Sequence, residues 1–148
     1  MGIISDKISA LRQFQNNMFE NIRVIINEYE YIISDMNTQD QLYERGVDRN
    51  GVELAEDNPY AFLTVEIKRA KNHPYNRVTL RDEGDFHRSF KVEARFNELE
   101  IYATDIKAIT LAERYGYEIY GLTDENINEL IWEYIKPELY EQFIKSLS

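Results

Sequence analysis

An apolar stripe through the first 36 residues constrains the fold of this chain more than any other feature. Positions spaced alternately three and four apart are apolar or aromatic in nine of ten cases: Ile4, Ile8, Leu11, Gln15, Met18, Ile22, Ile25, Tyr29, Ile32 and Met36. This is the spacing of a helix with nearly the period of a coiled coil. The stripe predicts one helix that begins near Ser5, a residue able to cap it, and ends near Met36.

The expected length of this helix bears on the organisation of the whole chain. Thirty-two helical residues extend about 48 Å, whereas a compact chain of 148 residues is about 40 Å across. We expect a single domain over residues 1–148, in which residues 1–36 run along one edge, break, or project onto a neighbouring subunit. A purely intramolecular core helix stays open as the alternative.

The middle of the chain mixes turn signals with short apolar runs. Residues 38–45 can add helical turns that end at Gly46, and Asn50-Gly51 predicts a turn. Residues 60–71 suit a strand or a helix. Residues 78–89 are interpreted as a short helix or turn that leads into a strand.

Two alternating segments predict the sheet. Residues 90–96 and 99–103 each place their apolar side chains on one face, and Asn97-Glu98 separates them by the two residues of a tight hairpin. Helices are expected over residues 105–115, from a cap at Thr123, and after Pro137, which either kinks a helix or opens a last one. The expected class is α+β, with a long N-terminal helix, a small antiparallel sheet containing a β-hairpin at about 90–103, and C-terminal helices.

Charge and composition exclude several classes of protein. Twenty-seven acidic residues against 17 basic ones give a net charge of −10, the wrong sign for a protein that grips nucleic acid by its phosphates. The best basic strip, Lys68, Arg69, Lys71 and Arg77, is short and is interpreted as ordinary surface. The chain has no cysteine, which excludes disulfides and thiolate chemistry. No signal-peptide-like start or membrane-length apolar run is present, so we expect a soluble, non-exported chain.

Residues that could carry catalysis are sparse. The two histidines, His73 and His87, have no metal-ligand partner at helical spacing. Asp85, His87 and Ser89 are the residue types of a catalytic triad, but they lie two apart and no nucleophile elbow surrounds the serine. The acidic residues within segment 48–57 do not have the spacing of a calcium-binding loop. The six glycines form no phosphate-binding motif. We expect no catalytic residues, no metal and no cofactor, and hence a protein that is not an enzyme.

Aromatic residues are the more unusual feature, since 11 Tyr, 7 Phe and 1 Trp make 13% of the chain. Tyr and Trp concentrate at protein interfaces, although part of the set must fill the core. We expect residues 115–122 to form a loop presented to a neighbour. The candidate interface residues are Ile22, Ile25, Tyr29, Tyr115, Tyr117, Tyr120, Trp132 and Tyr134.

Four segments in order resemble a known family. They are Tyr43-Glu44-Arg45-Gly46-Val47-Asp48-Arg49-Asn50-Gly51, the stretch from Val78 to Phe90, Ala103-Thr104-Asp105-Ile106-Lys107, and the stretch from Tyr115 to Thr123. This order is similar to the virion-morphogenesis and tail-completion (head–tail connector, neck) proteins of tailed phages and prophages of Bacteroides-type bacteria. The segment from Leu80 to Ser89 fits the Leu-x-x-x-Gly-x-Phe/Leu-x-x-Ser pattern of that group, with Glu83 where Thr or Ser is usual.

The resemblance implies a non-enzymatic structural protein of a phage virion. Such a protein would sit at the head–tail junction or in the tail, assemble as an oligomeric ring, and contact neighbouring connector or tail proteins. It would be made in the host cytoplasm and end in the virion, with no direct nucleic-acid binding and no membrane. The alternative is an acidic binding or inhibitor module that occludes a basic partner.

Overall fold

The computed structural model describes residues 2–55, 60–95 and 98–148 and confirms the α+β class. Its elements, in chain order, are α1 (Ile3–Asn16), α2 (Met18–Glu28), α3 (Glu30–Asp35), the π-helix η1 (Met36–Arg45), α4 (Phe62–Ala70), α5 (Asp85–Arg88), β1 (Phe90–Arg95), β2 (Glu98–Ala103), α6 (Ala108–Tyr115), the 3₁₀ helix η2 (Tyr117–Ile119), α7 (Asp124–Glu129), the π-helix η3 (Leu130–Ile135) and α8 (Lys136–Ser146).

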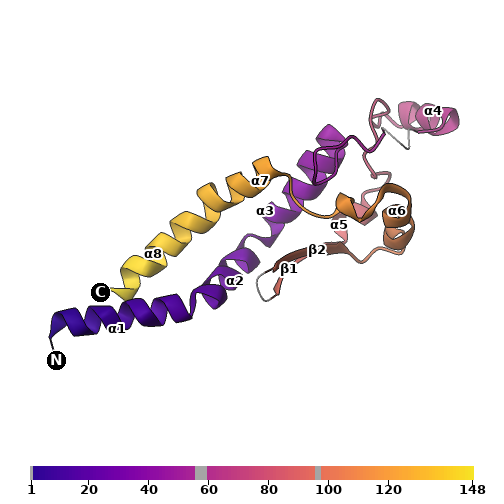
Figure 1. Cartoon of the computed structure of the whole chain (residues 1–148). Helices are drawn as coiled ribbons and strands as arrows, with labels where there is room; N and C mark the ends of the chain where they lie inside the picture. Colours follow the sequence, from indigo (N-terminus) through magenta and orange to yellow (C-terminus); the bar gives the residue numbers. More distant parts are fainter. Residues whose placement is uncertain (1, 56–59, 96–97) are drawn as a thin grey trace.

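The molecule is elongated, with two unlike ends (Figure 1). Helices α1 to η1 follow one another along its length, and α7, η3 and α8 return beside them, so that both chain termini lie at the same end. We call these two helical runs the arm. Helices α4 to α6 gather at the opposite end, and the hairpin leads from there back alongside α2 and α3; we call residues 60–115 the head.

The helix expected over residues 5–36 is divided into three. Asn17 (φ −97°, ψ 8°) and Tyr29 (φ −102°, ψ 18°) leave helical geometry and separate α1, α2 and α3. The expected cap at Ser5 is wrong, because the helix begins at Ile3 with Gly2 as its N-cap residue and without a side-chain cap. Ser5 therefore lies within the first turn.

The helical turns expected before Gly46 are confirmed, and they form η1. Gly46 has a left-handed backbone (φ +61°), and a Cβ atom there would lie 2.9 Å from the carbonyl oxygen of Val78. A glycine is therefore required both by conformation and by space. The turn at Asn50-Gly51 is also confirmed: Asp48 Oδ1 accepts hydrogen bonds from the amides of Asn50 and Val52.

The predicted hairpin is confirmed. Its antiparallel register pairs Phe90 with Ala103, Val92 with Ile101 and Ala94 with Leu99, which places the apolar side chains on one face. The predicted join at Asn97-Glu98 is wrong by one residue, because Glu98 belongs to β2 and pairs with Arg95. Phe96, expected at the end of the first strand, and Asn97 lie outside the described residues.

The remaining elements settle the alternatives that the sequence left open. Residues 62–70 are a helix rather than a strand. Helix α6 begins at Ala108 rather than at residue 105, because the Asp105 carboxylate accepts a hydrogen bond from the Lys107 amide and holds a turn there. Thr123 caps α7 as predicted. Pro137 lies in the first turn of α8, directly after η3, so α7, η3 and α8 form one continuous helical run.

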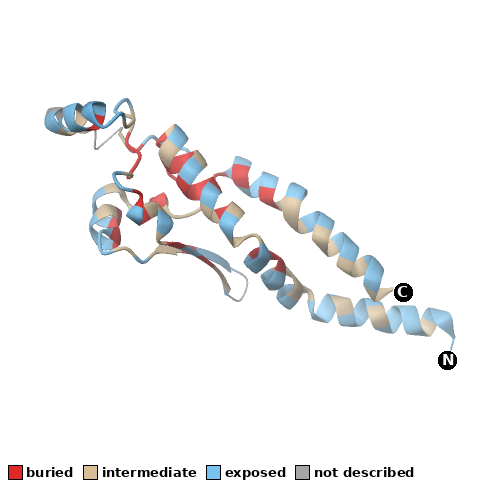
Figure 2. Cartoon of the chain, turned by 180° about the vertical axis from the view of Figure 1, so that it is seen from behind, coloured by how far each residue is buried: buried red, intermediate tan, exposed pale blue. Residues whose placement is uncertain are grey.

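The buried core lies where the arm meets the head (Figure 2). It combines one face of α2, α3 and η1 with the hairpin, α6 and the start of the C-terminal run. Its members include Ile26, Ile33, Leu42, Val78, Phe86, Phe90, Val92, Ile101, Ala112, Ile119 and Leu130. By contrast, none of the residues of α1 and α8, all of which are described, is buried.

Candidate functional site

The free end of the arm is held together by few contacts. Helices α1 and α8 meet edge to face through Phe14 and Phe143, whose ring centroids lie 5.5 Å apart. The apolar stripe of α1 is turned largely to solvent, with Ile4 77% and Ile8 45% exposed. The apolar face of α1, which is exposed in the single chain, is therefore a candidate surface for binding another molecule.

Closer to the core, the two helical runs are joined by Tyr29 and Tyr134, two aromatic residues that the sequence predicted to lie at a subunit interface. Tyr29 and Tyr134 pack edge to face at 5.1 Å, and the Tyr29 hydroxyl donates a 3.2 Å hydrogen bond to Glu138. Burial and the neighbouring Glu138 charge raise the pKa of Tyr29. Both rings thus join the break between α2 and α3 to the C-terminal run within one chain.

The two isoleucines predicted as interface face inward. Ile25 is fully buried and Ile22 packs partly buried against the core. This corrects the expectation for Ile25, because a side chain with no exposed surface serves the core of its own chain. The stripe changes its role along its length, from exposed in α1 to buried in the second half of α2.

The outer side of the C-terminal run is aromatic and acidic. Trp132 is 62% and Tyr140 66% exposed, and Ile144 follows one turn later at the surface. The Lys136 ammonium lies 3.4 Å from the centroid of the Trp132 ring, a cation–π contact. Residues 116–148 hold seven acidic and two basic residues, so this segment as a whole carries net negative charge.

The segment 115–122, expected as a loop presented to a neighbour, is instead bound to η1. Asn37, itself buried, donates to the Ile119 carbonyl oxygen (2.9 Å) and accepts from the Gly121 amide (2.8 Å). Tyr120 packs against Phe90 with ring centroids 5.4 Å apart. Tyr115 is half-buried, whereas Tyr117 is largely exposed. The expectation is thus corrected for most of this segment.

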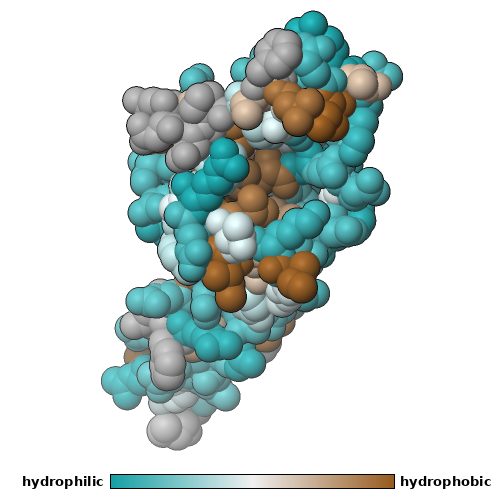
Figure 3. All heavy atoms as spheres, turned by 90° about the vertical axis from the view of Figure 1, so that its right-hand side faces the viewer, coloured by the Kyte–Doolittle hydropathy of each residue, from teal (hydrophilic) through white to brown (hydrophobic). Residues whose placement is uncertain are grey.

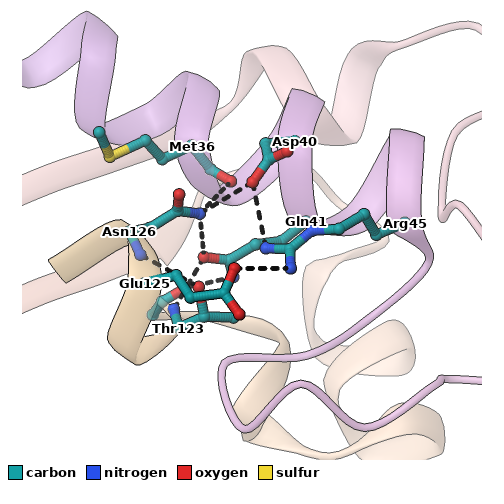
Figure 4. A network of polar contacts seen from close by, with 8 residues as sticks. Met36, Asp40, Gln41, Arg45, Thr123, Glu125 and Asn126 are labelled. Atoms are coloured by element: carbon teal, nitrogen blue, oxygen red, sulfur yellow. Dashed lines mark hydrogen bonds and ion pairs between the residues drawn. The ribbon is translucent and has the colours of Figure 1, made fainter. Parts of the chain in front are cut away.

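A buried polar network continues this attachment (Figure 4). Gln41 donates to the Gly121 carbonyl oxygen (2.9 Å), and its Oε1 accepts from the Thr123 amide (2.9 Å) and from Asn126 Nδ2 (2.8 Å). Asp40 accepts from Asn126 Nδ2 (3.0 Å) and from Arg45 (3.1 Å). These bonds fasten the start of α7 to η1, and so set the direction of the whole C-terminal run.

The network has a sequence signal that the periodicity argument missed. Asn37 and Gln41 lie four residues apart, hence on one side of a helix, next to the apolar Met36 and Leu42. Two amide side chains on the buried side of a helix require partners. Their partners come from residues 119–126, at least 80 positions away in sequence.

The head holds a cavity of about 300 Å³ between α4 and α6. Its lining includes Tyr60, Thr64, Lys68, Leu80, Arg81, Phe86, Lys107, Leu111, Arg114 and Tyr115. Lys68 is nearly buried; its ammonium donates to the Arg81 carbonyl oxygen (2.9 Å) and lies 4.9 Å from the Tyr60 ring centroid. The basic strip identified in the sequence thus contributes one inward-facing residue.

The triad-type residues Asp85, His87 and Ser89 are each engaged elsewhere. Asp85 pairs with Arg88, His87 Nε2 lies 2.9 Å from the Thr79 carbonyl oxygen, and the Ser89 hydroxyl donates to the Phe86 carbonyl oxygen. Burial lowers the pKa of His87 to about 4, against the opposing effect of the Thr79 contact. The imidazole is therefore neutral near pH 7 and acts as a packing and hydrogen-bonding group.

Within residues 2–55, 60–95 and 98–148, no group of three or more His, Asp or Glu side chains could hold a metal ion. In the same part of the chain, no helix has both the length and the apolar character to cross a membrane. Comparison with models of known protein families, with curated proteins and with solved structures finds no match.

Proposed function

We propose that this chain is a non-enzymatic structural component of a phage virion, at the head–tail junction or in the tail, that assembles with copies of itself into a ring. One observation carries the proposal: the free end of the arm exposes an apolar helix and an aromatic helix, while its own chain buries no residue of either. Apolar surface of this kind marks a protein–protein contact.

The contrast between the two halves of the N-terminal stripe supports this function. In α2 the apolar positions are used by the core, with Ile25 and Ile26 buried, whereas in α1 the same repeat exposes Ile4 and Ile8. The repeat continues beyond the point where the chain itself has anything to pack against it. If a second molecule covers the exposed positions of α1, the apolar repeat is buried along its whole length.

The resemblance of residues 43–51, 78–90, 103–107 and 115–123 to phage neck and tail-completion proteins supplies the biological setting. In that setting the protein is made in the host cytoplasm and ends in the virion, with copies of itself and neighbouring connector or tail proteins as its partners. Its role is to hold proteins together, with no cofactor and no direct contact to nucleic acid.

Light scattering coupled to gel filtration tests self-assembly. We expect wild-type protein to form a defined oligomer and the double variant Ile4→Glu/Ile8→Glu to shift toward monomer while its circular dichroism stays unchanged. The matched control Ser9→Glu/Asn16→Glu adds the same charge to exposed positions of α1 and should keep the oligomer. Wild-type protein that is monomeric at all concentrations, and absent from purified phage particles by mass spectrometry, overturns the proposal.

A second candidate function, an acidic module that occludes a basic partner, draws on the charge of the C-terminal run. Its exposed side places Glu129, Glu133 and Glu141 beside Trp132 and Tyr140, a combination suited to a basic site with an apolar centre. Tight, salt-sensitive binding to one basic protein, by a wild-type chain that stays monomeric alone, would favour this function over the first.

A further inference from the structure

The cavity in the head is lined by residues of α4 and α6, and these helices lie at the end of the molecule opposite to both termini (Figure 1). Seen from that end, apolar atoms line a hollow that polar groups surround (Figure 3). One wall comes from α4 and its N-cap residue, through Ala61, Thr64 and Lys68. The other comes from α6 and its N-cap residue, through Lys107, Leu111 and Arg114. Leu63, 69% exposed, lies beside the first wall on α4. The cavity is large enough for a bulky aromatic side chain.

The lining of this cavity is basic, in a chain that is acidic overall. The lining contains four basic and three acidic residues. Two of the acidic residues are neutralised by basic groups outside the lining. Asp82 accepts a 2.9 Å contact from Lys71, and Asp85 pairs with Arg88. The head as a whole holds ten Lys and Arg against nine Asp and Glu, whereas the rest of the chain holds seven against 18.

The outer side of the C-terminal run has the complementary chemistry. It presents Trp132 as a large exposed aromatic side chain, with Glu129 and Glu133 close to it in sequence and both exposed. Tyr140 lies about 12 Å further along the helix and is equally exposed. Trp and Tyr are the side chains that most often anchor an interface, and opposite charges around them fix its register.

The two surfaces lie far apart in one molecule, because α8 runs away from the head toward the termini (Figure 1). The C-terminal run of a chain cannot reach its own head cavity in this arrangement, so filling the cavity with this face requires a second copy. Contact between two different surfaces of identical chains is heterologous, and it produces a closed ring when the rotation between copies closes.

We propose that the head cavity of one copy receives the aromatic and acidic face of the C-terminal run of the next copy, with Trp132 as the anchor. Glu129 and Glu133 then lie against the basic lining contributed by Lys107 and its neighbours. This inference rests on the proposed function, since it names a second interface, besides α1, through which copies of the chain assemble.

Two complementary variants test the arrangement. The head variant, Ala61→Glu/Lys107→Glu, makes the cavity lining acidic at exposed positions, and the tail variant, Trp132→Ala/Tyr140→Ala, removes the exposed rings. Lys91→Glu/Thr110→Glu, with the same charge change at exposed positions outside the cavity lining, is the control for the first. Tyr31→Ala, at a tyrosine as exposed as Tyr140, is the control for the second.

Light scattering of each variant and of their equimolar mixture gives the decisive readout. We expect the concentration of half-assembly to rise about 30-fold for either variant alone, as for loss of an interface hot spot, and to stay unchanged in the controls. When both variants also carry Ile4→Glu/Ile8→Glu, which removes contacts through α1, their mixture should form a 1:1 dimer that grows no further, because one intact head and one intact tail remain. Added salt should weaken this dimer.

Three other outcomes are informative in different ways. Variants that assemble like wild type overturn the docking inference and leave self-assembly through α1 standing. Variants that each fail to assemble, but form no mixed dimer, also overturn it, because they indicate an interface that uses the same surface on both copies. A wild-type chain that never assembles overturns the proposed function itself.

Discussion

Asn126 donates a 2.8 Å hydrogen bond from Nδ2 to Oε1 of Gln41, across 85 positions of sequence, and both side chains are buried. The same Gln41 oxygen accepts the Thr123 amide, so one side chain satisfies both the cap residue and the first turn of α7. A buried polar group that loses its partner costs more than the bond itself. This pair therefore determines how firmly the C-terminal run is attached.

The substitution Gln41→Leu tests the attachment. It keeps the volume of the side chain but leaves the Thr123 amide and the Gly121 carbonyl oxygen without their partner. We expect the free energy of unfolding in urea to fall by about 2–4 kcal/mol. Gln39→Leu is the matched control, because Gln39 is exposed and bonds only the exposed Glu44 among the described residues; its effect should stay within about 0.5 kcal/mol. Equal losses would contradict the role of the network.

The glycine that ends η1 gives a second prediction. In Gly46→Ala, the new methyl group meets the Val78 carbonyl oxygen at 2.9 Å and the backbone must keep φ +61°. We expect a loss of about 2–4 kcal/mol. Gly51→Ala, where φ is +77° but no heavy atom lies within 4 Å, should lose only about 1–2 kcal/mol. Thermal unfolding followed by circular dichroism compares the two, and the reverse order would contradict the close approach to Val78.

The elements that the sequence predicted well are those with strong local signals. The hairpin follows from period-two alternation, the end of η1 from Gly46, and the start of α7 from Thr123, and each depends on residues close in sequence. What could not be predicted depends on distant contacts: the attachment of residues 119–126 to Asn37 and Gln41, and the cavity between α4 and α6. The stripe predicted helical structure in this region correctly, but neither its division at Asn17 and Tyr29 nor which half of it is buried.

Two neighbouring residues of α2, Val24 and Ile25, differ in burial, and this difference tests whether Ile25 belongs to the core rather than to an interface. Ile25→Glu places a carboxylate at a fully buried position, whereas Val24 is 44% exposed. An unpaired buried charge costs far more than a small chain can tolerate, so we expect Ile25→Glu to abolish the cooperative unfolding transition. Val24→Glu should fold with a stability within about 0.5 kcal/mol of wild type. A well-folded Ile25→Glu protein in circular dichroism and urea unfolding would contradict the burial of this residue.

Acid should destabilise the chain through His87. Burial lowers the pKa of this imidazole to about 4, from 6.5 in the unfolded chain, so the unfolded state binds a proton first as the pH falls. The stability associated with neutral His87 is complete above pH 6.5 and declines between pH 6.5 and 4, by roughly 3 kcal/mol in all. We expect the free energy of unfolding of wild type to fall more between pH 7.5 and 5 than that of His87→Gln, which cannot take up the proton. Parallel pH profiles from urea unfolding of the two proteins would contradict a buried, neutral His87. Carboxylates titrate in both proteins alike, so the difference between the profiles isolates the imidazole.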